Sequence, residues 1–310
     1  MSEGAGRPEG RAKQGPDAAS IEQMLQLETF EVQVAPVTPQ LRPFLHELTV
    51  SVLWPHRDSD LDFLIRQGRG YLALDEIGRP VGSAMYFPMG DDFALLGMMV
   101  TPPRLQARGG GRFLLRKIMR DCAGRDLRLN ATRSGYRLYR EEGFIDVGKV
   151  WQHQGVVGDV PATDPLPGIE IREINSEDRA AIEVMDDHAF GADRRAILAD
   201  LMDAGRGLIA LRAGRPCGFA LIRPFGKGQV IGPLVAEDEW LAVALTASAL
   251  GKLQGSFTRM DTPTMETGLR AFLTAAGMTQ FDTVTEMRLG PQRRAEAGMV
   301  TFALAAHSLG

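Results

Sequence analysis

The chain has 310 residues, of which 44% are hydrophobic and 24% charged, and its formal net charge is −4 at pH 7. This is the composition of an ordinary globular protein, and the length is enough for two domains. The acidic balance argues against nucleic-acid binding, and no apolar run approaches the roughly 18 residues of a membrane-spanning helix. We therefore expect neither a nucleic-acid partner nor a membrane partner.

The two cysteines, Cys122 and Cys217, lie in different halves of the chain, each in an apolar context. They predict two buried thiols and no disulfide framework, and the N-terminal sequence has no secretory apolar segment. Both features favour a cytoplasmic location. No group of Cys and His residues has metal-ligand spacing, so no metal site is expected.

Taken in chain order, the first half alternates strands and helices. Residues 1–20 are rich in Gly, Pro, Ala and charge and are expected to be disordered, and 21–27 is predicted to form a short helical turn. Strands are predicted over 30–34, 70–74, 80–87, 93–101, 126–131 and 147–153, and helices over 41–52, 61–67, 112–122 and 136–142.

Three consecutive glycines, Gly109, Gly110 and Gly111, stand between an apolar strand and a helix. Glycine leaves the main chain open to a ligand, and the first turn of a helix offers unpaired N–H groups and the positive end of its dipole. Together these features predict a cradle for a pyrophosphate group. The alternative is a flexible glycine-rich turn without a ligand.

The wider pattern, Pro103-x-x-Gln106-x-x-Gly109-x-Gly111, resembles the acyl-CoA signature of the GNAT (GCN5-related) N-acetyltransferases. It fits neither a P-loop nor the dinucleotide-binding G-x-G-x-x-G pattern. The resemblance implies an α/β fold, a twisted mixed sheet with helices on both faces, and acetyl-CoA as co-substrate. The residues that it places around the pyrophosphate are Gln106, Ala107, Arg108, Gly109, Gly110, Gly111 and Arg112.

The same resemblance implies that the strand before the loop also binds the coenzyme. The main chain of Met99, Val100 and Thr101 would pair with the pantetheine, and one of its N–H groups would polarise the thioester carbonyl. Gly97 would permit the bulge that such a splayed strand needs. The alternative is a plain core strand with a glycine for packing.

A second signature closes the predicted core. Residues 138–144 resemble the GNAT pattern Leu-Tyr-x-x-x-Gly-Phe, in which the tyrosine serves the leaving thiolate as a proton donor. Carried over, the catalytic residue is Tyr139, and the alternative is that Tyr139 only packs its helix. The family often has Asn at the position of Thr132, so here Asn130 would make that contact with the pantetheine.

Three segments recur in the same order at a nearly constant offset, which indicates an internal repeat. Residues 68–74 recur as 205–211, 78–84 recur as 214–220, and 30–32 has a counterpart at 169–172. We therefore predict two tandem GNAT-like domains. The expected division is a disordered tail 1–20, a catalytic domain 21–157, a linker 158–168, a degenerate repeat 169–290, and a C-terminal tail or added strand 291–310.

The second copy lacks the chemistry of the first. Its equivalent of the glycine loop, residues 232–240, has no glycine cluster and places three acids at the start of the next helix, where they would repel a pyrophosphate. Leu273 stands where the first copy has Tyr139. We expect one acetyl-CoA site per chain, with the second half as a structural element or a wall of the substrate pocket.

The resemblance implies transfer of acetyl from acetyl-CoA to a primary amine of a small molecule by direct attack. The alternatives are a non-catalytic acyl-CoA-binding module and a protein or peptide N-acetyltransferase, and a homodimer is one option for the assembly. No carboxylate stands within 95–100, where many family members carry a base. The other candidate bases are His46, Asp58, Asp60, Asp91, Asp92, the cluster Asp186-Asp187-His188, and water.

Overall fold

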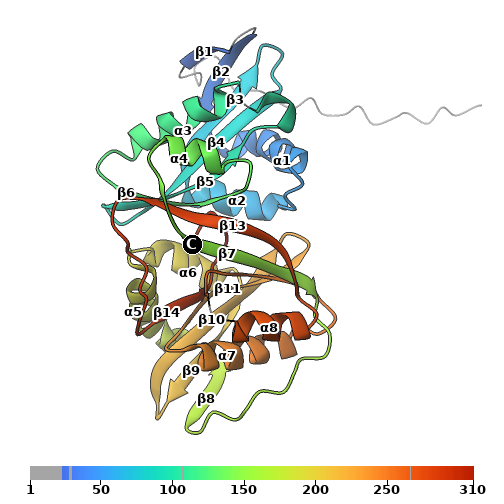
Figure 1. Cartoon of the computed structure of the whole chain (residues 1–310), viewed down its shortest axis with the longest axis vertical. Coiled ribbons are helices and arrows are strands. Elements are labelled where there is room, and N and C mark those ends of the chain that lie inside the picture. Colours follow the sequence, from blue (N-terminus) through green and yellow to red (C-terminus); the bar gives the residue numbers. More distant parts are fainter. Residues whose placement is uncertain (1–22, 28–29, 107, 266) are drawn as a thin grey trace, which may run out of the picture.

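A computed structural model describes residues 23–27, 30–106, 108–265 and 267–310. Two lobes stack along the long axis of the molecule, with the first half of the chain in one lobe and most of the second half in the other (Figure 1). The tail 1–20, expected to be disordered, lies outside the described residues. Within the described residues, no helix is long and apolar enough to cross a membrane.

The two halves repeat one order of strands and helices. The first half forms β1 (Gln23–Leu27), β2 (Phe30–Pro36), α1 (Arg42–Ser51), α2 (Asp58–Gln67), β3 (Arg69–Asp75), β4 (Pro80–Met89), β5 (Phe93–Val100), α3 (Gly110–Asp121), β6 (Asp126–Ala131), α4 (Tyr136–Glu141) and β7 (Ile145–Val156). The second half forms β8 (Ile169–Glu173), α5 (Arg179–Phe190), α6 (Arg195–Asp203), β9 (Arg206–Arg212), β10 (Arg215–Phe225), β11 (Gly228–Ala236), α7 (Glu239–Gly251), β12 (Phe257–Thr262), α8 (Gly268–Ala275), β13 (Thr279–Leu289) and β14 (Val300–Ala303).

The prediction of a helical turn at 21–27 is wrong for the part that is described. Residues Gln23–Leu27 form β1, which pairs antiparallel with β2 from Gln23 opposite Val34 to Leu27 opposite Phe30. The edge of the sheet offers this segment main-chain partners, and such tertiary pairing overrides a weak helical preference. The remaining predicted strands and helices of the first half are all present.

Helix α3 packs on the sheet through its apolar face. Its apolar residues Leu114, Leu115 and Ile118 share one face, and all three are buried in the cluster that also contains Val81 and Ala84 of β4. The start of α3 is thereby held against the strands that precede it. This packing positions the glycine loop over the sheet.

The described strands form one continuous sheet, in the order β1-β2-β3-β4-β5-β6-β13-β7-β12-β11-β10-β9-β8, with β14 paired to β11. The last strands of the two halves are exchanged, because β13 pairs antiparallel with β6 of the first lobe and β7 with β12 of the second. The two exchanged strands pair with each other across the waist of the molecule (Figure 1). The predicted boundaries 21–157 and 169–290 thus follow the repeat in the sequence, whereas each folded lobe contains a strand from the other half.

One buried apolar cluster joins the lobes. Phe44 of α1 and Leu61 of α2 belong to the same cluster as Phe190 of α5 and Leu198 of α6. Burial of such side chains contributes roughly 1.5–3 kcal/mol each. The helices that flank the waist therefore hold the two halves together from both sides.

A buried ionic group ties β13 into the first lobe. Glu286 of β13 accepts a hydrogen bond from Nη2 of Arg294 at 2.8 Å and lies 3.8 Å from Nε of Arg128 of β6. All three side chains are buried. Although burial alone would raise it, the two guanidinium groups hold the pKa of Glu286 below its ordinary value.

Of the two options for residues 291–310, the structure shows the added strand, and it joins the second half. Strand β14 pairs antiparallel with β11, with Leu234 opposite Ala303 and Ala236 opposite Val300. The chain then turns back to the waist, where its last residues lie between the lobes (Figure 1). The tail therefore reaches from the second half towards the first.

The two cysteines are buried, unpaired thiols, as predicted. Burial raises the pKa of Cys122 to about 12 and also raises the pKa of Cys217. Neither thiol is a reactive thiolate at neutral pH.

Candidate active site

The glycine loop joins β5 to α3. Gly109 adopts a φ of 86°, in the left-handed region that favours glycine, and precedes the first helical residue. In the described residues no side chain caps α3, so the N–H groups of its first turn stay available. A Cβ atom added to Gly109 would meet nothing within 4 Å, which shows that the loop is open on that side.

The charged and polar residues of the loop have different surroundings. The side chain of Gln106 donates to the carbonyl oxygen of Thr101 at 3.2 Å, so it ties the loop to the end of β5. Arg108 is exposed and lines an open surface cavity. Arg112 pairs instead with Glu141 and Glu142 of α4. Ala107, another predicted pyrophosphate residue, lies outside the described part of the chain.

Strands β5 and β6 pair and then separate. Their parallel register runs from Phe93 opposite Asp126 to Leu96 opposite Leu129, and it ends there although both strands continue. The separated ends, 97–100 of β5 and 130–131 of β6, form the splay. Among the described residues, the main-chain groups of β5 that face the splay have no strand partner on β6 and can pair with a ligand.

A bulge in β5 lies within the splay. Its register with β4 shifts between Ser83 opposite Val100 and Met85 opposite Gly97. Met98 carries the strained backbone, with a φ of 50°, and its carbonyl oxygen accepts a hydrogen bond from Oγ of Ser83 at 2.8 Å. The bulge was expected, but Gly97 is not the residue that supplies its backbone conformation.

Gly97 has a different role, which is to leave room for the tail. A Cβ atom added to Gly97 would lie 2.5 Å from Oγ and 3.1 Å from Cα of Ser308. On the other side of the splay, Nδ2 of Asn130 donates to the carbonyl oxygen of His307 at 2.9 Å. Residues His307 and Ser308 therefore bridge the two separated strands.

Asn130 and Thr132 have different hydrogen-bond partners. The Oδ1 atom of Asn130 is buried and has no hydrogen-bond partner among the described residues, so it remains free to accept one. The hydroxyl of Thr132 accepts the N–H of Gly135 at 3.4 Å, and its carbonyl oxygen accepts the N–H of Tyr136. Thr132 thus supports the start of α4.

Tyr139 is buried on α4, beside the glycine loop. Its ring packs edge-on against Phe144 with centroids 6.0 Å apart, and a Cβ added to Gly135 would lie 3.0 Å from it. Burial raises the pKa of the Tyr139 hydroxyl, which therefore stays protonated at neutral pH. Burial is the cause of this shift, and no hydrogen bond from the described residues contributes to it.

Helix α4 touches the start of α3. A Cβ added to Gly111 would lie 3.9 Å from Cδ2 of Leu138 and 3.3 Å from Oγ1 of Thr101. Arg116 of α3 also donates to Glu142 at 2.9 Å. The two signatures, far apart in the sequence, therefore meet at the end of β5.

The corresponding place in the second half is closed. Only two residues separate β11 from α7, and Asp238 caps that helix by accepting the N–H of Leu241 at 2.8 Å. β11 and β12 also separate after a short parallel pairing, but β14 lies in this second splay, paired to β11, and the N–H of Leu304 donates to the carbonyl oxygen of Asp261. The tail occupies main-chain positions that are free in the first half.

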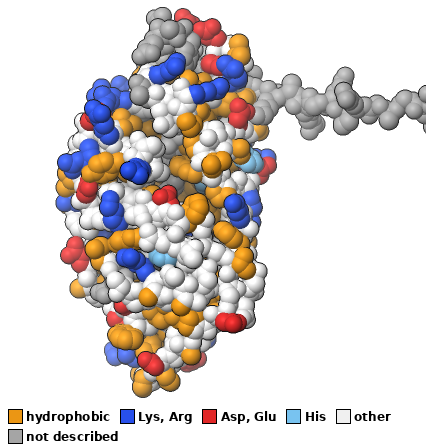
Figure 2. All heavy atoms as spheres, turned by 45° about the vertical axis from the view of Figure 1, so that its right-hand side comes forward, with side chains coloured by type: hydrophobic (Ala, Val, Ile, Leu, Met, Phe, Trp, Pro, Cys, Tyr) orange, Lys and Arg blue, Asp and Glu red, His pale blue; other side chains and the backbone are white. Residues whose placement is uncertain are grey.

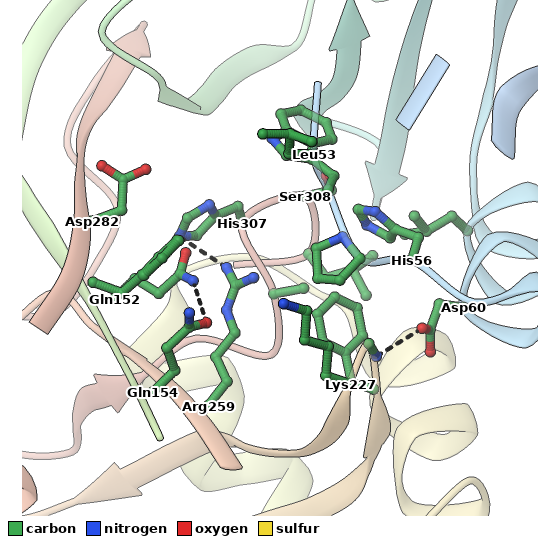
Figure 3. A pocket seen from close by; sticks show the side chains of 18 of the residues that line it. Leu53, His56, Asp60, Gln152, Gln154, Lys227, Arg259, Asp282, His307 and Ser308 are labelled. Atoms are coloured by element: carbon green, nitrogen blue, oxygen red, sulfur yellow. Dashed lines mark hydrogen bonds between the residues drawn. The ribbon is translucent and has the colours of Figure 1, made fainter. Parts of the chain in front are cut away.

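A cavity between the lobes opens beside the first splay. Thr132, His307 and Ser308 line it together with residues of both halves. In Figure 3, Gln152, Gln154 and Arg259 lie on the side of His307, and His56, Asp60 and Lys227 lie on the other. Its large apolar and aromatic lining residues are Leu53, Trp54, Phe63, Leu64, Phe225, Phe257, Phe281, Val284 and Leu309.

The two histidines of the cavity are held in the neutral form. The pKa of His56 is lowered to about 4, mainly by burial and with smaller contributions from Arg259 and Arg223, against the opposite effect of Asp60. Burial likewise lowers the pKa of His307 to about 4. Nε2 of His307 lies 3.4 Å from Oδ2 of Asp261 and also 3.4 Å from Nη2 of Arg259, so this ring nitrogen faces both members of the Arg259–Asp261 ion pair.

The predicted bases fall in several places. His46 and Asp58 form an exposed pair at 2.8 Å, Asp92 is exposed and pairs with Arg293, and buried Asp186 is held by Arg194. Asp60 alone among them lines the cavity. His307 and Ser308 were missed, because 291–310 was considered only as a C-terminal tail or an added strand. The polar pair after an apolar run at 302–306 was the available signal.

Figure 2 shows one face of the molecule, on which Lys and Arg side chains are interspersed with acidic and hydrophobic ones. In the residues that the structure describes, no three His, Cys, Asp or Glu side chains are grouped to hold a metal ion.

The fold and this arrangement define a tandem acyltransferase, with a glycine loop, a splayed strand pair and a tyrosine in its first half. Residues 39–144 match the model of the Acetyltransferase (GNAT) family, and residues 182–300 match that of an Acetyltransferase (GNAT) domain. The chain therefore belongs to the GNAT family of N-acetyltransferases, with one GNAT domain in each half.

Individual proteins show the same likeness. The uncharacterized N-acetyltransferase YitH of Bacillus subtilis is 27% identical over 251 residues, which cover 77% of this chain and 87% of YitH. A putative acetyltransferase from Pyrococcus horikoshii has a TM-score of 0.74 at 21% identity, over 90% of this chain and 96% of that one. A tandem GNAT protein from the clavulanic acid biosynthesis pathway has a TM-score of 0.59 at 14% identity, over 84% and 99%. The two structures show that the fold recurs over nearly the whole length of each protein.

Proposed function

We propose that this protein transfers acetyl from acetyl-CoA to a primary amine of a small molecule, at one site in its first half. The observation that carries the proposal is the splay of β5 and β6, which lies between the glycine loop on one side and the inter-lobe cavity on the other. A thioester held in such a splay can be reached by an amine from the cavity. The second splay contains β14, which supports a single coenzyme site.

The glycine loop and the splay would bind the coenzyme. The N–H groups at the start of α3, with Gly109, Gly110 and Gly111, would hold the pyrophosphate, helped by the exposed Arg108. Those main-chain groups of Met99, Val100 and Thr101 that face the splay would pair with the pantetheine. One N–H near the bulge would also stabilise negative charge on the thioester oxygen.

Tyr139 would serve the leaving group. The amine nitrogen forms a bond to the carbonyl carbon, the carbon–sulfur bond breaks, and the thiolate takes the hydroxyl proton of Tyr139 or a hydrogen bond from it. The raised pKa of Tyr139 keeps the hydroxyl protonated before the reaction and favours a hydrogen bond to the thiolate over complete proton transfer. No covalent intermediate with the protein is needed.

His307 is the group that we place nearest to the departing amine proton. Its ring is neutral above about pH 4 and is oriented by Asp261 and Arg259, which both lie 3.4 Å from Nε2. Such a weak base can accept the proton only once the carbon–nitrogen bond is forming, since the nitrogen is then much more acidic. Deprotonation of the free ammonium ion would take place in bulk water before attack.

The proposal is tested first by calorimetry with acetyl-CoA, which should bind at one site per chain. Release of free thiol across a panel of small amines then measures turnover. Tyr139→Phe should lower kcat about 10²-fold or more and leave the acetyl-CoA Kd within threefold. Absence of acetyl-CoA binding would refute the proposal.

Tyr136→Phe is the matched control on the same helix, because its hydroxyl bonds to Asp146 at 2.9 Å on the outside. It should change kcat by less than threefold. Equal loss in both variants would mean that Tyr139 acts only through the packing of α4. Acetyl-CoA binding without thiol release for any amine would favour the regulatory module instead.

A further inference from the structure

We propose that the acceptor carries a carboxylate as well as its amine, and that Arg223 in the wall of the inter-lobe cavity binds this carboxylate. The inference rests on the proposed function, because it assigns the acceptor of the same site. It predicts an amino acid or a close relative with an apolar side chain.

Arg223 is a buried cation that has no carboxylate partner among the described residues. It lies at the end of β10, is 5% exposed and lines the cavity. Its Nη2 donates to the carbonyl oxygen of Ala305 at 2.8 Å, while Nε is buried with no hydrogen-bond partner in the described residues. A buried, incompletely bonded guanidinium is costly unless an anion meets it, and its planar donors suit a carboxylate.

The acids near Arg223 are already engaged. Both oxygens of Asp60 accept from Arg57, and Oδ2 also accepts the N–H of Gly226 at 2.9 Å. Asp261 is held by the side chain of Arg259, with Nη2 to Oδ2 at 2.7 Å. Each of these two ion pairs has no net charge. The hydrogen bonds above hold both carboxylates in place, so neither is free to turn towards Arg223.

The charge that remains in the cavity would be balanced by one anion. Arg223 and Lys227 contribute two positive charges and Asp282 one negative charge, which leaves one positive charge after the pairs above are set aside. The neutral histidines add none. A single carboxylate balances this site, whereas an uncharged amine leaves it unbalanced.

The other residues that line the cavity indicate the chemistry of the rest of the ligand. The rings of Phe63 and Phe225 lie beside the guanidinium of Arg223, with centroids 5.9 and 5.0 Å from its central carbon. Further aromatic and apolar side chains complete the lining and suit an apolar body. His307 and Ser308 line the same cavity at the splay, so the amine end would face them.

The test compares the common amino acids with the amines that result from removing their carboxylates, by thiol release from acetyl-CoA. At least one amino acid should have a kcat/KM ten times or more that of its matched amine. Arg223→Gln should lower kcat/KM for that amino acid about tenfold or more, as expected for loss of a charge-assisted hydrogen bond, and for the matched amine less than threefold. Arg223→Lys should recover part of the loss.

Two further variants test the inference if the Arg223→Gln protein fails to fold. Lys227→Met, at an exposed position, should lower the preference for the amino acid about threefold. Arg215→Gln changes an exposed arginine at the far end of the same strand and should leave the preference unchanged.

Three results would overturn the inference: matched amines used as well as the amino acids, equal losses for both substrates in Arg223→Gln, or no amino acid acetylated by protein that binds acetyl-CoA. Turnover of amines without any preference for a carboxylate would leave the proposed function intact. Failure of acetyl-CoA to bind would remove both.

Discussion

Gly97 is the point at which the C-terminal tail comes closest to the splayed strand. Its missing side chain lets Ser308 approach the main chain of β5, while the strained φ of the bulge belongs to Met98. The hydrogen bond from Asn130 to His307 holds the tail on the other side. At this scale the geometry of the proposed site depends on a contact between residues 211 positions apart in the sequence, Gly97 and Ser308.

Gly97→Ala should therefore displace the tail and reduce turnover. The added Cβ would lie 2.5 Å from Oγ of Ser308, so Ser308 has to move. Such a shift beside the reacting groups is expected to lower kcat about 10- to 100-fold. Gly148→Ala in β7 is the control, because its Cβ would meet nothing within 4 Å. Steady-state kinetics that show equal effects in both variants would contradict this role.

The neutral histidines of the cavity make stability depend on pH. His56 has a pKa of about 4 in the folded protein against an ordinary value of 6.5, so the unfolded chain binds the extra proton between these values. The contribution is therefore present above pH 6.5 and is lost as the pH falls towards 4.

Urea unfolding should show this loss. Because the ring of His56 is not fully enclosed, we expect about 1–2 kcal/mol of its contribution to disappear between pH 7 and pH 5. His56→Gln should flatten the profile over this interval by about the same amount. An unchanged pH profile in the variant would show that His56 is not the group responsible.

At the scale of elements, α3 and α7 occupy equivalent places and differ at their first turns. Helix α3 begins after glycine with no capping side chain, whereas α7 is capped by Asp238 and starts two residues after β11. The first arrangement leaves N–H groups for an anion, and the second uses them internally. The same fold element thus supports a ligand site in one half and only packing in the other.

Gly110→Asp should separate binding from stability. A carboxylate in the first turn of α3 interacts favourably with the helix dipole, by about 0.3–1 kcal/mol, but repels a pyrophosphate. Calorimetry should show acetyl-CoA affinity reduced tenfold or more, with no loss in thermal stability. Gly124→Asp makes the same change of charge beyond the other end of α3 and should leave the affinity unchanged. Unchanged affinity in Gly110→Asp would place the phosphates elsewhere.

At the scale of the whole molecule, the exchanged strands make the two halves interdependent. The first lobe contains β13 from the second half, and the second lobe pairs β12 with β7 from the first. The apolar cluster of α1, α2, α5 and α6 adds a shared core at the waist. Neither half can complete its sheet alone, so we expect the lobes to unfold together.

Glu286→Gln tests this interdependence. It leaves Arg128 and Arg294 buried without a charged partner, which should cost about 3–5 kcal/mol. Scanning calorimetry should show one transition, lowered by roughly 10 °C. Glu173→Gln removes an exposed partner of Lys252 and should change the Tm by only about 1–2 °C. Two separate transitions, with only one displaced, would contradict the shared core.

Some features of the fold and the site were predictable from the sequence, and others were not. The glycine loop, the order of elements and the repeat were predictable, because each rests on residues close together in the chain, such as Gly109–Gly111 before α3. β1 was misread, since its strand exists only through pairing with β2. The contribution of His307 and Ser308 to the cavity could not be predicted, because the sequence around them does not indicate which distant residues they contact.

The sequence by itself determined that this chain carries two copies of one fold and that only the first has the glycine loop and the tyrosine of its family. Local backbone freedom, helix termini and side-chain chemistry are properties of short segments, so short segments reveal them. The tertiary structure alone decided that the last strands are exchanged, that β14 lies in the second splay, and that the tail ends against the first. These outcomes depend on hydrogen bonds and burial between segments that are distant in the sequence, and such contacts are selected by the packing of the whole molecule.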